Sequence, residues 1–281
     1  MGPGYPGPAG ANRVDRDRPA RLSWRVQFVS PAEHYDRFMG RYAPTLAVAL
    51  ADAAEIGPQT RALDVGCGPG GLASELVARA GAERVAAIDP AAQFAEACRQ
   101  RHPGADVRVG PAEQLPWEDG TFDAALAQLV IAFMSDPDRG VAEMARVTRP
   151  GGVVALCMWD LHDGGMTMLH TFWSAVRKIV PDAGGEQKRA GTRAGDIAER
   201  LRRAGLDDVR DGALTARAEY AGFDDFWEPF TYAVGPSGQY LRSLDPERQA
   251  AVREGCRAAL PSDGPFGLDA RAWYARGTVP G

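Results

Sequence analysis

The segment Ala62–Gly71, ALDVGCGPGG, constrains the fold of this chain more than any other stretch. Its apolar start, which includes Leu63 and Val65, predicts a short buried strand, and the glycines that follow predict a turn with positive φ angles. A helix then begins, and its first amide groups point toward the same turn. These features together predict a nucleotide-binding loop. Because the glycines also satisfy the G-x-G-x-x-G pattern, this segment alone leaves NAD, FAD and other adenosyl cofactors open.

Composition sets the class of protein. With 281 residues, 45% of them hydrophobic, the chain can bury a full core. The net charge of −5 gives no basic footprint, so we expect no nucleic-acid partner. The four cysteines are far apart and form no C-x-x-C motif, which argues against a zinc site or a disulfide framework. There is no signal-peptide pattern and no apolar run of about twenty residues, so we expect a soluble cytoplasmic protein without a membrane partner.

Apolar strand patterns alternate with helical patterns along most of the chain. Alternation of this kind predicts a mostly parallel α/β sheet with helices on both faces, with ligands at the carboxyl ends of its strands. Helix starts are expected at Asp136-Pro137 and Asp245-Pro246. A last, half-exposed strand is expected beside the sixth. The seven predicted strands cover residues 62–65, 84–88, 106–109, 122–129, 152–159, 208–220 and 266–274.

Three segments of the chain are expected to lie outside this sheet. Residues 1–20, rich in Gly, Pro, Arg and Asp, have little to bury and are expected to be a disordered tail. Residues 21–281 then form one domain. Within it, residues 21–55 are expected to form an N-terminal helical lid, whose aromatic residues either cover the sheet edge or contact a ligand. Residues 221–262 are expected to form a small helical cap before the last strand.

The choice of cofactor comes from residues that follow the glycine loop. Asp89 ends the second predicted strand, where its carboxylate can accept hydrogen bonds from both hydroxyls of a ribose. A cofactor with a 2′-phosphate is thereby disfavoured. After the third strand, the loop Gly110–Glu113 is expected beside an adenine, whose ring nitrogens its main-chain amides can meet.

Five segments in order, DVGCGPG, AAIDP, GPAEQLPW, GTFDAALAQ and RVTRPGG, resemble the successive motifs of class I S-adenosylmethionine-dependent methyltransferases. They span Arg61–Gly152, and the resemblance implies a Rossmann-like fold and S-adenosylmethionine as the methyl donor. A dehydrogenase gives no reason for Phe122-Asp123 at the start of the fourth strand or for the RPGG turn into the fifth.

The resemblance also implies roles for individual residues. It places Asp64 and the glycine backbone at the methionine moiety, Asp89 at the ribose, and Gln128 near the sulfonium. Pro111 departs from the family pattern, because many relatives carry Asp or Ser there to hold the adenine amino group. Glu113 or the main chain must then replace that bond. The full set of expected cofactor-binding residues is Tyr35, Asp64, Gly66, Cys67, Gly68, Asp89, Pro90, Ala112, Glu113 and Gln128.

Methyl transfer needs a base only when the acceptor must lose its proton during attack; otherwise positioning of the acceptor can supply much of the catalysis. His162 and His170 follow the carboxyl end of the fifth strand and are the candidate catalytic bases. The sequence indicates no metal site.

Aromatic residues crowd the segments that follow the fifth and sixth strands. They form either the core of the cap or an apolar pocket for the acceptor, and the candidate pocket residues are Phe133, Trp159, Trp173, Phe226 and Trp227. We therefore expect an enzyme that methylates a small, hydrophobic or aromatic molecule. Two alternatives stay open, a tRNA or protein methyltransferase and a non-catalytic S-adenosylmethionine-binding protein. A homodimer is compatible with the sequence.

Overall fold

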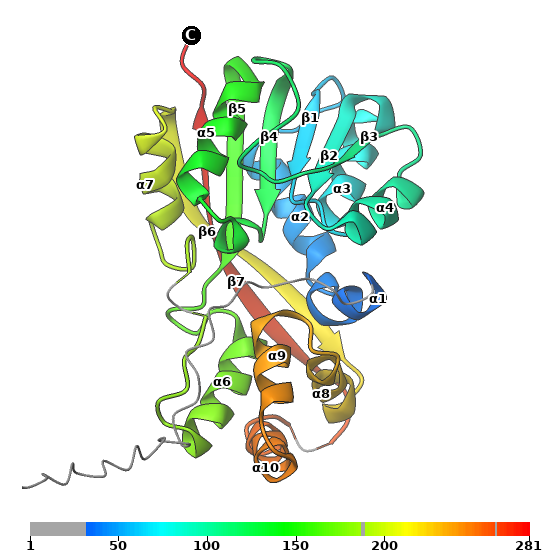
Figure 1. Ribbon diagram of the computed structural model, residues 1–281, viewed down its shortest axis with the longest axis vertical. Coiled ribbons are helices and arrows are strands. Elements are labelled where there is room, and N and C mark those ends of the chain that lie inside the picture. Colours follow the sequence, from blue (N-terminus) through cyan, green and yellow to red (C-terminus); the bar gives the residue numbers. More distant parts are fainter. Residues whose placement is uncertain (1–31, 187–188, 262) are drawn as a thin grey trace, which may run out of the picture.

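A computed structural model describes residues 32–186, 189–261 and 263–281 of the chain (Figure 1). Its seven strands form one sheet in the order β3-β2-β1-β4-β5-β7-β6. β1 to β5 pair in parallel, whereas β7 runs antiparallel to both of its neighbours. The strands are β1 (Ala62–Val65), β2 (Val85–Asp89), β3 (Asp106–Val109), β4 (Phe122–Gln128), β5 (Thr148–Trp159), β6 (Asp207–Tyr220) and β7 (Phe266–Thr278).

The predicted mostly parallel α/β sheet is therefore confirmed, with two differences. β5 begins earlier than expected, at Thr148, which pairs with Phe122 ahead of the register shift between β4 and β5. The last strand lies beside the sixth as expected, but it also pairs with β5 and so occupies the position between them. Chain order alone does not determine this position.

Helices flank the sheet, and others lie in the segments expected to form the lid and the cap. The predicted starts of α5 and α10 are confirmed, since Asp136 and Asp245 each accept a hydrogen bond from a first-turn amide at 3.0 and 2.8 Å. The α-helices are α1 (Ala32–Tyr35), α2 (Ala43–Ala53), α3 (Gly71–Ala80), α4 (Ala92–Arg101), α5 (Pro137–Val147), α6 (Thr167–Ile179), α7 (Asp196–Arg203), α8 (Phe223–Thr231), α9 (Gly235–Ser243) and α10 (Pro246–Arg257), with a π-helical turn η1 (Asp36–Gly40) and two short 3₁₀ turns, η2 (Ala82–Arg84) and η3 (Ile131–Phe133).

β6 and β7 are the longest strands and extend past the carboxyl ends of β4 and β5 (Figure 1). Around this extension gather α6, α8, α9 and α10, so the expected cap is joined by a helix that precedes β6. The lid contacts the cap through an ion pair between Arg41 and Asp225 at 3.1 Å. The hydroxyls of Tyr42 and Tyr220 lie 2.9 Å apart at the same junction. These two contacts connect the segment before α2 to the end of β6 and the start of α8.

The expected tail, residues 1–20, and the first part of the expected lid, residues 21–31, lie outside the described residues. Among the helices of the described residues, none is both long and apolar enough to cross a lipid bilayer.

Candidate active site

The glycine loop after β1 has the predicted backbone geometry. Gly66, Gly68 and Gly70 have φ angles of +73°, +53° and +102°. A Cβ added at Gly66 would lie 2.4 Å from a methyl group of Val130. Both this close contact and the positive φ exclude a side chain at Gly66. A Cβ added at Gly68 would meet no atom within 4 Å and would instead project into open space. That open space is where a ligand can approach the main chain.

Asp89, at the end of β2, is held in a fixed orientation. Its Oδ2 accepts a hydrogen bond from the Gly68 amide at 2.9 Å, and its Oδ1 accepts one from the Ala91 amide at 2.8 Å. Burial raises the pKa of this carboxyl, while the two amides act in the opposite direction. Because a carboxylate oxygen can accept more than one hydrogen bond, both oxygens keep capacity for the hydroxyls of a ribose.

Asp64 and Gln128 carry buried acceptors that lack a partner. Neither carboxylate oxygen of Asp64 nor Oε1 of Gln128 has a hydrogen-bond partner among the described residues. Asp64 is 1% exposed, and this burial raises the pKa of its carboxyl to about 8. Since buried polar atoms are almost always satisfied, these oxygens indicate a ligand that supplies donors or positive charge. The ammonium and sulfonium groups of S-adenosylmethionine fit this requirement.

All ten predicted cofactor-binding residues lie along one cleft at the carboxyl ends of β1, β2 and β4. The cleft has two lobes with empty volumes of about 1060 and 1340 Å³, open in part to solvent. The first lobe contains Asp64 and Cys67, and the second contains Asp89, Pro90, Ala112 and Glu113. Both lobes are lined by Tyr35, Gly66, Gly68 and Gln128. Within the described part of the chain, no cluster of His, Cys, Asp or Glu could hold a metal ion.

Glu113, another of the predicted cofactor-binding residues, also contacts the main chain of the protein. Oε1 of Glu113 accepts hydrogen bonds from the amides of Ser135 and Asp136 at 2.6 and 3.1 Å and so fixes the chain at the start of α5. The role of Glu113 at the adenine stays a prediction. The sequence reasoning missed Phe94 and Met134, which line the same lobe. Their only signal is their position just after the motifs at Asp89 and Gln128.

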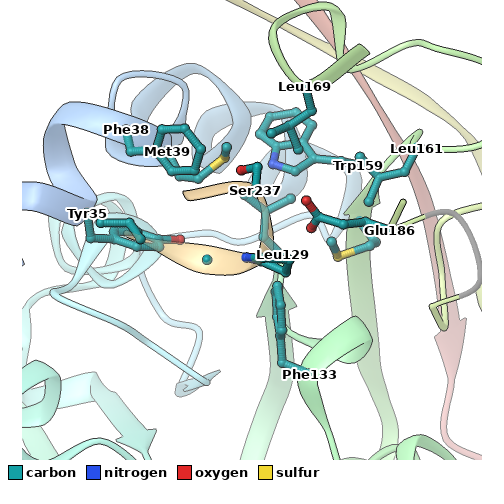
Figure 2. Close-up of a pocket in the computed structure, with 14 residues that line it drawn as sticks. Tyr35, Phe38, Met39, Leu129, Phe133, Trp159, Leu161, Leu169, Glu186 and Ser237 are labelled. Atoms are coloured by element: carbon teal, nitrogen blue, oxygen red, sulfur yellow. The ribbon is translucent and has the colours of Figure 1, made fainter. Parts of the chain in front are cut away.

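A second, largely apolar cavity adjoins this cleft, with an empty volume of about 460 Å³ that is open in part to solvent (Figure 2). Tyr35, Leu129 and Phe133 line both spaces and form their common wall. The remaining lining residues come from the lid, β5, α6, the segment before α7 and α9, and are Phe38, Met39, Met158, Trp159, Leu161, Leu169, Glu186, Val234, Gly235, Pro236 and Ser237.

The wall residue Leu129 has an unusual backbone. Its φ is +63°, a left-handed conformation that costs a residue other than glycine about 1–3 kcal/mol. The Leu129 amide donates to the Cys157 carbonyl at 2.9 Å, which holds the strained turn directly after β4. The turn places the Leu129 side chain between cleft and cavity. Nothing in the sequence pattern of this strand signals the strain.

The structure brings two of the five predicted acceptor-binding residues, Phe133 and Trp159, to this cavity. Trp173 lies behind it, where its indole N–H donates to Glu186 at 3.2 Å. Phe226 and Trp227 line neither the cavity nor the cleft. They are 0% and 9% exposed and pack against other rings of the cap, with Trp227 stacked on Phe223. For these two residues the structure matches the alternative in which the aromatics form the core of the cap.

Neither predicted base lies in the cleft or the cavity. The side chain of His162 is 52% exposed and lies 3.3 Å from the carboxylate of Asp163. His170 is exposed on α6 and lines a separate small hollow that it shares with Glu186. Both residues follow the carboxyl end of β5, as predicted, but their side chains are exposed. Sequence reasoning missed Glu186, since a lone Glu in an irregular segment has no pattern.

Comparison with known proteins agrees with this geometry. Residues 63–156 match the family model described as "Methyltransferase domain". A demethylmenaquinone methyltransferase from Mycolicibacterium gilvum is 33% identical over 193 residues, which cover 64% of this chain and 79% of that protein. A putative methyltransferase of Bacillus halodurans has a solved structure with a TM-score of 0.55 at 17% identity, covering 84% of this chain and 99% of the other, and this likeness concerns the fold alone.

Other relatives match over a smaller share of their length. An uncharacterized methyltransferase of Mycobacterium tuberculosis is 34% identical over 144 residues, 51% of this chain and 56% of its own. The chain thus spans about half the length of that relative. The residues that match the family model include all the predicted cofactor-binding residues except Tyr35. These similarities, taken with the fold and with the buried Asp64 and Gln128 oxygens that lack a hydrogen-bond partner among the described residues, show that the chain belongs to the class I S-adenosylmethionine-dependent methyltransferase family.

Proposed function

We propose that this enzyme transfers the methyl group of S-adenosylmethionine to a small, mainly apolar molecule held in the cavity behind Tyr35 and Leu129. The observation that carries the proposal is the wall that cleft and cavity share. An acceptor in the cavity can approach a methyl group presented from the cleft across this wall. When bound, S-adenosylmethionine supplies a methyl carbon on a cationic sulfur, whose leaving group is a neutral thioether.

The residues of the cleft have separable tasks in this proposal. Asp64 binds the ammonium group, Asp89 binds the ribose hydroxyls, and the loop at Ala112 and Glu113 borders the adenine. Oε1 of Gln128, buried and without a partner, lies near the sulfonium and stabilises its charge. Tyr35 closes the cleft from the lid side and excludes water from the reacting atoms.

The size and lining of the cavity support a small acceptor over a macromolecule. The space is small and lies among several elements of the fold, and few of the groups that line it are polar. A nucleic acid would require a basic docking face, and the net charge of −5 gives no indication of one. We propose that the partner is a small molecule and that no nucleic acid or membrane takes part. The relative from Mycolicibacterium gilvum is named for demethylmenaquinone, which is in keeping with an apolar acceptor.

Calorimetry with the purified protein tests the proposal. S-adenosylmethionine and S-adenosylhomocysteine should both bind, and NAD should not, because the cleft fits an adenosyl group next to buried acceptors for an ammonium group. Methyl transfer from radiolabelled S-adenosylmethionine into a pool of apolar metabolites should follow. Binding of S-adenosylhomocysteine with no transfer to any small molecule would favour the non-catalytic alternative, and tight NAD binding alone would contradict the assignment.

A further inference from the structure

One carboxylate lies within the otherwise apolar acceptor cavity. Glu186, from the segment between α6 and α7, is 7% exposed and has leucine, methionine and aromatic neighbours around the cavity. Figure 2 shows its carboxylate extending toward the middle of the cavity, with Ser237 across from it. An isolated buried charge is costly, so a carboxylate in this position requires a reason.

The protein satisfies this carboxylate only in part. Among the described residues this carboxylate accepts one hydrogen bond, at Oε1 from the Trp173 indole at 3.2 Å. No Lys, Arg or His of the described chain forms an ion pair with it. The cavity holds two further polar atoms without partners in the described structure, Oγ of Ser237 and Nε1 of Trp159. A ligand that supplies the missing hydrogen bonds would explain all three.

The electrostatic surroundings make the charge of Glu186 responsive near neutral pH. Burial raises the pKa of its carboxyl to about 7, and the Trp173 N–H and the Arg189 guanidinium act against this shift. Tyr35 lies across the acceptor cavity, and the other titratable or charged groups near Glu186 line the small hollow behind it, namely Asp160, His170 and Arg177. An N–H or O–H donor in the cavity would favour the ionised carboxylate.

We propose that Glu186 selects the methyl acceptor by accepting a hydrogen bond from it, so that the substrate class is a small apolar molecule with an amine or hydroxyl group. This inference rests on the proposed function. A carboxylate acceptor would bring a second anion into the apolar cavity beside Glu186 and is selected against. Ser237 and Trp159 then supply donors for a carbonyl or ether oxygen of the same molecule.

Three compounds of one shape test this selection, namely 2-naphthol, 2-naphthylamine and 2-naphthoate. Their binding to the full-length protein saturated with S-adenosylhomocysteine is measured by calorimetry. Naphthol and naphthylamine should bind at least about 10-fold more tightly than naphthoate. Glu186→Gln keeps the side-chain shape and an oxygen for Trp173, and it should weaken naphthol binding about 10- to 100-fold, the usual effect of losing a hydrogen bond to a charged group. Glu199→Gln, at an exposed position on α7, is the matched control and should change nothing.

The pH dependence gives a second measurement. Naphthol binding to the wild-type protein should strengthen as the pH rises through about 7, and the Glu186→Gln curve should be flat over the same range. Wild-type selection among the three compounds needs no variant, so it tests the proposal even if Glu186→Gln does not fold. Equal binding of naphthoate and naphthol, no binding of any of the three, or a Glu186→Gln protein that binds naphthol like wild type would overturn the inference. Failure of S-adenosylhomocysteine to bind the wild-type protein would instead contradict the proposed function.

Discussion

The cleft and the proposed acceptor cavity lie on either side of the same three side chains, yet they are built in different ways. The cleft is made of main chain at the carboxyl ends of adjacent parallel strands, and its key side chains follow those strands directly. The cavity is lined by residues from several separate elements, including the expected lid, η3, β5, α6 and α9. Cleft geometry is therefore local in sequence, whereas cavity geometry depends on how distant segments pack.

The same difference appears in how each space treats polar groups. In the cleft, Asp89 is held by two amides of the glycine loop and the following turn, which fixes its orientation. In the cavity, Glu186 has a single indole N–H. A cleft that is oriented by backbone suits one invariant ligand, whereas a cavity of adaptable side chains can be specialised for a particular acceptor.

The largest expected effect is on the free energy of unfolding, at a cap residue that lines neither the cleft nor the cavity. Trp227→Ala should lower the free energy of unfolding by about 3–5 kcal/mol, because the indole is 9% exposed and packs in the cap core. The affinity for S-adenosylhomocysteine of the folded protein should be unchanged, since Trp227 does not line the cleft. Urea denaturation and calorimetry measure the two quantities. Val109→Ala, at a side chain 53% exposed, is the control and should change stability by less than about 0.5 kcal/mol.

A Trp227→Ala protein as stable as wild type would mean that the cap is not stabilised by its own core. The cleft and the cavity would then differ less in how they are built than the packing of their residues indicates. Loss of cofactor affinity in the folded fraction would also contradict the separation, because cap and cleft would then be coupled.

The second prediction concerns the unpaired carboxylate of the cleft. The pKa of Asp64 is about 8 in the folded protein against 3.8 ordinarily, so between these values the folded state holds a proton that the unfolded state releases. The free energy of unfolding therefore falls as the pH rises from about 4 to about 8. Asp64→Asn has no such titration, and by pH 8 it should be more stable than wild type by on the order of 2–5 kcal/mol.

Urea denaturation of both proteins at pH 5, 6, 7 and 8 measures this difference, which should grow with pH. Because other titrating groups are common to both proteins, their contributions cancel in the comparison. Affinity for S-adenosylmethionine should fall in the variant, since the ammonium loses its counter-charge. Parallel stability curves would show that Asp64 does not titrate in this range.

The sequence predicted the cleft well because its determinants are short-range. The glycine loop, Asp89 and Gln128 each lie at or directly after a strand, and in a parallel sheet the strand ends converge. The cavity was predicted only in outline. Phe133 and Trp159, which were expected to contact the acceptor, line it, but Glu186 and Ser237 lie in segments without periodicity, and their approach depends on packing of α6 and α9. Whether an aromatic residue such as Trp227 faces a cavity or a core cannot be decided by spacing.

The third prediction tests how far the backbone fixes the cleft. Asp89→Ala should weaken S-adenosylhomocysteine binding by about 2–4 kcal/mol, because two hydrogen bonds from the ribose to a charged group are lost. The amides of Gly68 and Ala91 also lose their acceptor, so the loop should become less ordered. Calorimetry gives the affinity, and Asp211→Ala, at an exposed position on β6, is the matched control. An unchanged dissociation constant would remove Asp89 from the ribose site.

The smallest effect is expected at the two histidines that the sequence offered as bases. His162→Ala and His170→Ala should each change methyl transfer by about twofold or less, since neither side chain lines the cleft or the cavity. Both side chains are exposed, so folding should be affected little. The measurement is turnover of an acceptor found by the radiolabel screen, at saturating S-adenosylmethionine. A loss of 100-fold or more in either variant would mean that the segment 160–170 moves into the cavity during turnover. The division between cleft and cavity would then hold only for the open or resting arrangement of the protein.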